Sequence, residues 1–180
     1  MKLNYSISNY KFSLKVQNID WLNTVELLKN CVHVKKFKVY SNFIVFRRDY
    51  VYTLFKPGIG KSSAHLNITK LRDKSEILKA VNIIKNKISG QLLLSTIKID
   101  NITCSLHLNR EINLREFYKT NNSNLQISYK SEKFPGLFVK TNKGTILIFH
   151  TGRVILVGCK TKRDIKWLMK LICAYIPSQS

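Results

Sequence analysis

Five residues in the first half of the chain, Gly58 to Ser62, have types that could bind phosphate. Gly-Ile-Gly-Lys-Ser resembles the end of a phosphate-binding loop, in which backbone amides and a lysine surround the phosphates of a nucleotide. Such a loop also needs a glycine at the position that Phe55 holds and a helix directly after the serine. Because Ala64 to Leu71 has the pattern of a strand, we interpret the stretch as a hairpin turn. A backbone-amide contact with a phosphate is the alternative that remains open.

Cysteines and histidines are the other residues that could perform chemistry. The four cysteines lie far apart and form no C-x-x-C pair: Cys31, Cys104, Cys159 and Cys173. They predict reduced thiols, not a disulfide framework or a thiolate metal site. Cys31 with His33 and Cys104 with His107 could suggest zinc, but the two spacings differ. No nucleophile-base or paired-acid spacing is present. We predict no enzyme, metal, cofactor or small-molecule ligand.

The charge of the chain indicates a polyanionic partner. Its 180 residues include 31 Lys and Arg against 10 Asp and Glu, which gives a formal net charge of +21 spread along the chain. Nucleic acid is the usual partner of such a protein, although a lysine-rich surface can also serve solubility alone. The abundance of Lys, Asn and Ile suggests an AT-rich genome, such as that of a large DNA virus.

Length and hydropathy predict a globular intracellular protein. With 44% hydrophobic residues, the chain can bury the core of one domain, or of two half-domains that share one sheet. No segment has the length of a signal peptide's apolar region or the roughly 20 apolar residues of a membrane span. We expect no membrane partner and a location in the nucleus or at a site of viral transcription.

The clearest local pattern lies between Lys133 and Ile176. Apolar and β-branched runs at 145–149 and 154–157 flank a four-residue turn that contains Gly152, which predicts a hairpin. Thr161 with Asp164 predicts the capped start of a helix. The strands are apolar on both faces, and one helix can cover only one of them. The other face is therefore expected to have a partner.

The first half of the chain repeats this order of elements. Lys11 to Asp20 alternates like a strand, Trp21 to Cys31 has a helical period, and three further strands precede a helix that ends before Gly90. After Gly90 the order begins again, with Leu92 to Leu106 as a strand and Asn113 to Lys119 as a helix. An internal duplication, with a first repeat at 10–90 and a second at 92–177, is the economical interpretation.

Aligning the halves predicts specific equivalent positions. Without gaps, the middle strands pair Tyr40 with Phe134, Val45 with Val139 and Phe55 with Phe149. About four extra residues at 59–62 then pair Ile77 with Trp167 and Leu78 with Leu168. At the front, Lys15-Val16-Gln17-Asn18-Ile19 pairs with Lys98-Ile99-Asp100-Asn101-Ile102.

Three motifs resemble the TATA-box-binding protein family. The stretch from Ser128 to Leu137 is similar to the family's S-Y-x-x-E-x-F-P-G-L segment. The hairpin from Ile148 to Lys160 resembles its I-F-x-S-G-K-x…G-A-K motif. In addition, Val16 to Ile19 and Ile99 to Ile102 are similar to the I-Q-N-I and I-Q-N-M that open the family's two repeats. The resemblance covers nearly the whole chain.

The resemblance implies an α+β fold and a DNA-binding function. The expected fold is a saddle-shaped curved antiparallel sheet of two pseudo-symmetric repeats, with helices on the convex face. The concave face would bind A·T-rich double-stranded DNA in the minor groove and bend it, since an apolar sheet with a few amide donors suits A·T-rich sequence. General transcription factors or an RNA polymerase assembly are the implied protein partners.

The resemblance also assigns candidate DNA-binding residues. Asn18 and Asn101 match the central asparagines, Phe134 and Phe149 match the wedges of the second repeat, and Phe55 matches one wedge of the first. The other wedge of the first repeat stays open between Tyr40, Phe37 and Phe43. The remaining candidates are groove-lining apolar residues and one cation near the phosphates: Leu147, Ile155, Val157 and Lys140.

Several positions depart from the family pattern. Asp20, Thr53, His65 and Asn67 stand where apolar groove-lining side chains are expected, and Lys130 replaces a glutamate in the segment that contacts transcription factor IIB. Glu132 keeps the neighbouring acid. Asp20, His65 and Asn67 favour an alternative function, a scaffold of a transcription complex with weak or no sequence-specific DNA binding. Asp20 has two interpretations: a carboxylate that opposes DNA binding, or the cap of the helix that begins at Trp21.

Overall fold

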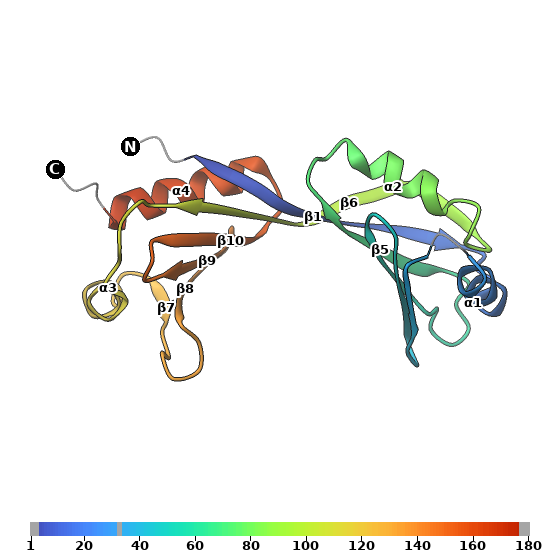
Figure 1. Ribbon diagram of the computed structural model, residues 1–180, viewed down its shortest axis with the longest axis horizontal. Coiled ribbons are helices and arrows are strands. Elements are labelled where there is room, and N and C mark those ends of the chain that lie inside the picture. Colours follow the sequence, from blue (N-terminus) through green and yellow to red (C-terminus); the bar gives the residue numbers. More distant parts are fainter. Residues whose placement is uncertain (1–3, 32–33, 177–180) are drawn as a thin grey trace. The chain divides into compact units, whose positions relative to one another are not determined.

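The computed structural model describes residues 4–31 and 34–176. His33, which together with Cys31 could suggest zinc, lies outside the described residues. The helices and strands follow one another along the chain in this order: β1 (Tyr5–Gln17), α1 (Trp21–Lys29), β2 (Lys36–Val39), β3 (Phe43–Arg47), β4 (Val51–Phe55), β5 (Ala64–Leu71), α2 (Glu76–Ile84), β6 (Gln91–His107), α3 (Leu114–Asn121), β7 (Gln126–Ser128), β8 (Gly136–Thr141), β9 (Gly144–Phe149), β10 (Arg153–Cys159) and α4 (Lys162–Tyr175) (Figure 1).

All the strand pairs with an assigned register are antiparallel, and one sheet contains every strand in the order β2-β3-β4-β5-β1-β6-β10-β9-β8-β7. The chain divides into two compact units, Asn9–Asp100 and Met1–Ser8 with Asn101–Ser180. We call them the first and the second unit. The division falls inside β1 and β6. It does not fall at the loop before Gln91, where the sequence pattern ended the first repeat.

Each unit is built in the same order of elements: one long strand, a helix, four strands and a second helix. This order, and the α+β class with antiparallel strands and four helices, agree with the sequence-based expectation. The repeat bounds of 10–90 and 92–177 remain a proposal. We therefore compare the units below by their own strand registers.

One face of the strands in the first unit is covered by helices. Side chains alternate along β4 and β5, and those on one side are fully buried, as expected for Leu54, Leu66 and Ile68. The Tyr52 hydroxyl donates a hydrogen bond of 3.0 Å to the carbonyl oxygen of Ala80, so α2 lies on this side. Leu28 from α1 lines the same region as Tyr52. We call this the helix-covered face and the opposite one the open face.

The second unit has the same arrangement. The expected core residues Ile148, Val154 and Leu156 are buried, and α3 and α4 pack over β8 and β9 on that side. Helix α4 begins with the predicted capping box: the Thr161 hydroxyl accepts from the Asp164 amide at 3.1 Å, and the Asp164 carboxylate accepts from the Thr161 amide at 2.8 Å. The helix therefore starts at a fixed point next to the last strand.

Several predicted equivalences are wrong. Leu78 is 57% exposed whereas Leu168 is fully buried, so these two residues do not occupy matching positions. Ile77 is 8% exposed whereas Trp167 is 43% exposed, so they do not occupy matching positions; the buried counterpart of Ile77 by strand register is Ile165. Val45 faces Thr53, and Phe138 faces Leu147, so Phe138 and not Val139 is the counterpart of Val45. Three residues separate Arg47 from its partner Val51, whereas four separate the equivalent pair Lys140 and Thr145, and an ungapped alignment cannot represent this difference.

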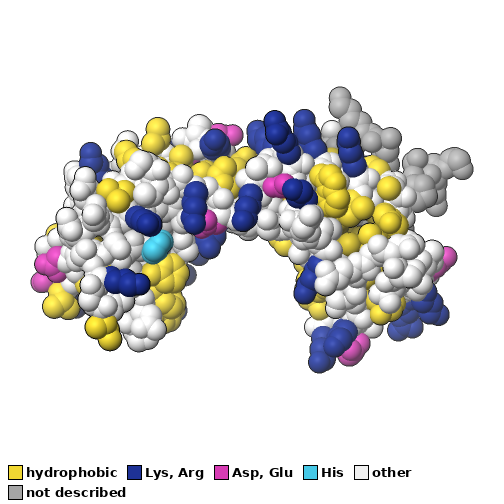
Figure 2. Space-filling view, turned by 180° about the vertical axis from the view of Figure 1, so that it is seen from behind, with side chains coloured by type: hydrophobic (Ala, Val, Ile, Leu, Met, Phe, Trp, Pro, Cys, Tyr) yellow, Lys and Arg dark blue, Asp and Glu magenta, His cyan; other side chains and the backbone are white. Residues whose placement is uncertain are grey.

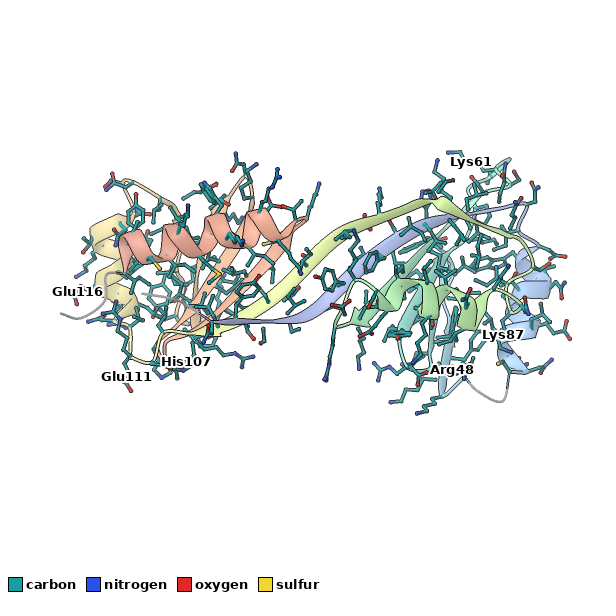
Figure 3. All side chains as sticks on the ribbon, turned by 90° about the horizontal axis from the view of Figure 1, so that it is seen from above. Arg48, Lys61, Lys87, His107, Glu111 and Glu116 are labelled. Carbon is teal, nitrogen blue, oxygen red and sulfur yellow. The ribbon has the colours of Figure 1, made fainter. Side chains whose placement is uncertain are left out.

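The glycine-rich stretch forms the connection between β4 and β5. Lys61 is exposed there, lies at the outer edge of its unit in Figure 3, and no helix follows Ser62. The strand predicted from Ala64 is present. All four cysteines are free, and burial raises the pKa of Cys104 to about 12 and that of Cys159 to about 11, so both remain protonated thiols at neutral pH.

Asp20 is the N-cap of α1. Its carboxylate oxygen accepts a hydrogen bond of 3.0 Å from the Asn23 amide, and its own amide donates to the carbonyl oxygen of Ser89 at 2.9 Å. The interpretation of Asp20 as a groove-lining carboxylate is therefore wrong. It lies beyond the end of β1, where a short acceptor satisfies an amide that the helix leaves unpaired.

The capping role predicts the effect of replacing Asp20. Asp20→Val should lower the free energy of unfolding by about 1 kcal/mol, because it removes the acceptor for the Asn23 amide. Asp20→Asn is the matched control, since asparagine caps equally well, and it should melt close to the wild type. Thermal melts followed by circular dichroism check both variants. A Val variant as stable as the Asn variant would contradict the capping role.

Within the part of the chain that the structure describes, no helix combines the length and the apolar composition needed to cross a membrane.

Candidate nucleic-acid interface

The open face of the second unit is apolar, and no helix within residues 4–31 and 34–176 covers it. Leu147, Ile155 and Val157 alternate with buried core residues along β9 and β10 and are half-buried. Leu147 and Ile155 are direct cross-strand neighbours. The structure thus brings these three predicted groove-lining residues together on one surface.

An aromatic cluster lies at one end of this face. Phe134 has its ring centroid 5.8 Å from that of Phe149 and 4.9 Å from that of Phe138. All three rings are half-buried, so one side of each remains available. Phe138 was not among the predicted residues, although its alternation with the core residue Leu137 along β8 could have identified it.

Gly136 makes room for the Phe134 ring. It is the cross-strand partner of Phe149, and a Cβ atom there would lie 2.7 Å from Cε1 of Phe134 and 3.1 Å from Cε1 of Phe149. A side chain at this position would occupy the space of the ring. The glycine in the F-P-G-L segment therefore has a steric purpose: it lets a residue from the preceding loop lie over the strand.

The first unit forms a similar aromatic cluster from different strand positions. Phe43 pairs with Phe55 across the strands, with ring centroids again 5.8 Å apart, and Tyr40 stacks on Phe43 at 4.5 Å. By register Phe43 corresponds to Gly136, so its ring occupies the space that Phe134 fills in the second unit. Phe37 faces the core residue Phe46 and so lies on the other face. Of the three open choices for the second wedge, Phe43 fits best, with Tyr40 stacked beyond it.

The middle of the open face differs between the units. In the second unit one row of cross-strand neighbours consists of Ser105, Ile155, Leu147 and Phe138. The matching row of the first unit consists of Ser13, Asn67, Thr53 and Val45. We call these sets the middle rows. The predicted polar departures at Thr53 and Asn67 are thus on the open face, and His65 lies beside them, exposed, as the neighbour of Lys15 and Phe55.

Asn101 supports a bulge between β6 and β10. Its Oδ1 accepts a hydrogen bond of 2.6 Å from the amide of Gly158, which has a φ of 83°. The same arrangement exists in the first unit: Oδ1 of Asn9 accepts from the amide of Lys70 at 2.6 Å, and Lys70 has a φ of 71°. The bulge interrupts the pairing of β1 with β5 at the corresponding place.

Asn9 is therefore the counterpart of Asn101, and the prediction that Asn18 holds this position is wrong. Asn18 is an exposed residue with a φ of 51° just after β1, on the way to α1. The sequence Lys-Val-Gln-Asn-Ile looked like the better match, but position in the sheet depends on the bulge. Ser8-Asn9-Tyr10 was the signal that the sequence analysis missed.

Each open face has a basic side chain at a corresponding position. Lys140 is exposed beside Thr145, and Arg47 takes the corresponding place in the first unit. Lys and Arg account for most of the charged side chains visible in Figure 2. Within residues 4–31 and 34–176, no group of three His, Cys, Asp or Glu side chains could hold a metal ion. Such a surface can attract a polyanion through its Lys and Arg side chains and contact it through apolar and aromatic side chains.

Comparison with protein families matches residues 96–178 to the family described as transcription factor TFIID, or TATA-binding protein (TBP). TATA-box-binding proteins of two archaea are similar to this chain. That of Methanococcus aeolicus is 29% identical and that of Methanococcus maripaludis 33%, each over 57% of this chain and 58% of the relative. The chain thus spans little more than half the length of these relatives.

A solved structure resembles the whole chain. The TBP of Methanococcus jannaschii matches with a TM-score of 0.75 and 23% identity, over 98% of this chain and 99% of that one. This likeness confirms the predicted fold class.

The paired bulges lead to a prediction about stability. Asn9→Ala and Asn101→Ala should each lower the free energy of unfolding by about 1 kcal/mol, because each leaves a bulge amide without its side-chain acceptor. Asn18→Gly is the control: it keeps the positive φ without strain and should change stability by less than about 0.5 kcal/mol. Thermal melts decide. If Asn9→Ala were neutral while Asn101→Ala were destabilising, the two positions would not be equivalent.

Proposed function

We propose that the chain is a transcription initiation factor of the TATA-binding protein family, which residues 96–178 match, and that it binds A·T-rich promoter DNA through the minor groove and bends it. Double-stranded DNA is the proposed partner, together with general transcription factors or an RNA polymerase assembly. The observation that supports this function best is the open face of the second unit. There Leu147, Ile155 and Val157 lie on the same strand face as Phe149, whose ring contacts that of Phe134.

Such a face suits the minor groove for two physical reasons. At A·T pairs the groove floor offers acceptors and no amino group, so an apolar surface meets few unsatisfied donors. Half-buried aromatic rings at one end can enter a base step and unstack it, and the unstacking energy is offset by contact with the bent duplex. The excess of Lys and Arg adds a sequence-independent, salt-sensitive attraction to phosphates.

A second candidate function is a scaffold that assembles a transcription complex and binds DNA weakly. Thr53, His65 and Asn67 favour it, because they make the open face of the first unit more polar than that of the second. The exposed loop residues Lys130 and Glu132 lie next to the aromatic cluster in sequence and could contact a protein partner. The observed cap at Asp20 removes one argument for this alternative, since that carboxylate is occupied at the helix terminus.

The two functions differ in their response to competitor DNA. If the chain is a minor-groove factor, an A·T-rich duplex should compete at least about tenfold better than a G·C-rich duplex, and better than single strands. The preference should persist when salt is raised, although every affinity falls. Fluorescence anisotropy at several salt concentrations measures this. Equal competition by all three DNAs would favour the scaffold.

The aromatic cluster predicts how bending can be separated from binding. Phe134→Ala with Phe149→Ala should abolish bending while the salt-dependent encounter with DNA is largely kept, since wedge and phosphate contacts are independent contributions. Energy transfer between dyes on the two duplex ends reports bending. Trp167→Ala is a matched control, because this exposed aromatic residue is on α4 and not among the strand residues of the open face. If the double variant bends DNA as the wild type does, these rings are not wedges.

A further inference from the structure

We infer that the two open faces differ in what they accept: the face of the first unit tolerates G·C base pairs, whereas the face of the second unit requires A·T. This inference rests on the proposed function, because it concerns the sequence specificity of the same minor-groove surface. It assigns Asn67 and Thr53 as specificity-determining residues. The wild-type protein would then accept a target that is A·T-rich in one half and mixed in the other.

The middle rows carry the inference. At register-matched positions Asn67 replaces Ile155, and Thr53 replaces Leu147. Ile155 and Leu147 can only exclude water from whatever lies against them. Asn67 and Thr53 present an amide and a hydroxyl at the same two places. Both are half-buried, so these groups lie within the face.

These polar groups are not used inside the protein. Among the described residues, neither the Asn67 amide nor the Thr53 hydroxyl has a hydrogen-bond partner. The row ends at Ser13, which is only 4% exposed and whose hydroxyl likewise has no partner in the described part of the chain. Ser13 Oγ is buried without a partner, which is unusual for a polar atom. Asn67 and Thr53 are only half-buried, so solvent reaches their polar groups and a ligand can take the place of that water. An external group is therefore the natural partner for this row.

A G·C pair supplies such a group. In the minor groove it differs from A·T by the exocyclic amino group of guanine, which is a hydrogen-bond donor. Against Ile155 and Leu147 that amino group would lose its water and gain no acceptor. Against the Asn67 amide oxygen or the Thr53 hydroxyl it can donate a replacement bond. The free-energy cost of leaving the guanine amino group without an acceptor, which disfavours G·C on an apolar face, is thus removed in the first unit.

Features that the faces share cannot explain such a difference. Both units have an aromatic pair with centroids 5.8 Å apart, and both have an asparagine at the bulge. The cations at Arg47 and Lys140 correspond as well. Thr69 also replaces Val157 by register, but its hydroxyl is used inside the protein, where it donates to the carbonyl oxygen of Val51 at 3.5 Å. The polar groups that remain available are those of the middle rows, and exchanging these side chains should move the difference from one unit to the other.

The first experiment uses the wild-type chain and three duplexes of equal length: A·T-rich throughout, G·C in one half, and G·C in both halves. The protein is free to orient itself on each. We expect G·C in one half to reduce affinity by less than about threefold, because the first unit takes that half, and G·C in both to reduce it by at least about tenfold further. If G·C in one half and G·C in the second half each reduced the affinity by the same factor, the inference would be overturned and the proposed function would stand. Failure to bind the A·T-rich duplex would instead overturn the proposed function.

A reciprocal exchange of side chains provides the matched control. Asn67→Ile with Thr53→Leu should bind the A·T-rich duplex at least as well as the wild type, but should lose about tenfold on the duplex with G·C in one half. Ile155→Asn with Leu147→Thr should gain affinity for the duplex with G·C in both halves, relative to its own affinity for the A·T-rich one. Thermal melts confirm that each variant is folded. If the first exchange left discrimination unchanged in a folded protein, Asn67 and Thr53 would not determine specificity.

Discussion

One-sided burial of the strands is the constraint on which the rest of the structure depends. In each unit the helices cover a single face, and residues such as Leu54 and Ile148 on that face are fully buried. Because strand side chains alternate, burying one set commits the other set to the opposite face. The residues of that second set were free to become apolar, aromatic or polar without loss of the core. The candidate interface thus follows from the same register that builds the fold.

This constraint explains how much could be predicted from sequence. The hairpin before α4, the capping box at Thr161 and Asp164, and the buried sets in β4, β5, β9 and β10 depend on local patterns, and the structure contains them as expected. The equivalences between halves were less predictable. Each unit has its own turn lengths, so an alignment without the correct gaps drifts by one or two residues, and a drift of one moves a strand residue to the other face.

The candidate site shows the same limit at the level of single residues. Asn18 was chosen because its neighbours resemble those of Asn101, yet the hydrogen bond to a bulge amide belongs to Asn9. A bulge is produced by pairing between strands that are distant in sequence, so no local sequence motif predicts it. The aromatic cluster of the first unit is similar: Phe43 fills from the strand a space that Phe134 fills from a loop above Gly136. Phe43 and Phe134 are therefore not aligned in the sequence, although their rings occupy equivalent places in the two units.

Charge and the chemistry of the open faces would contribute differently to DNA binding. A net charge of +21 attracts any polyanion and cannot distinguish sequences, so discrimination has to come from the open faces. If both faces were equally apolar, a target could be bound in either direction with similar energy. The amide and hydroxyl of the first unit break that equivalence, because against A·T pairs they can only donate hydrogen bonds, whereas the guanine amino group also gives their oxygens a donor. A duplex with unequal halves would therefore be bound in one preferred direction, and the polar residues that weaken the family likeness of the first unit would become the source of that direction.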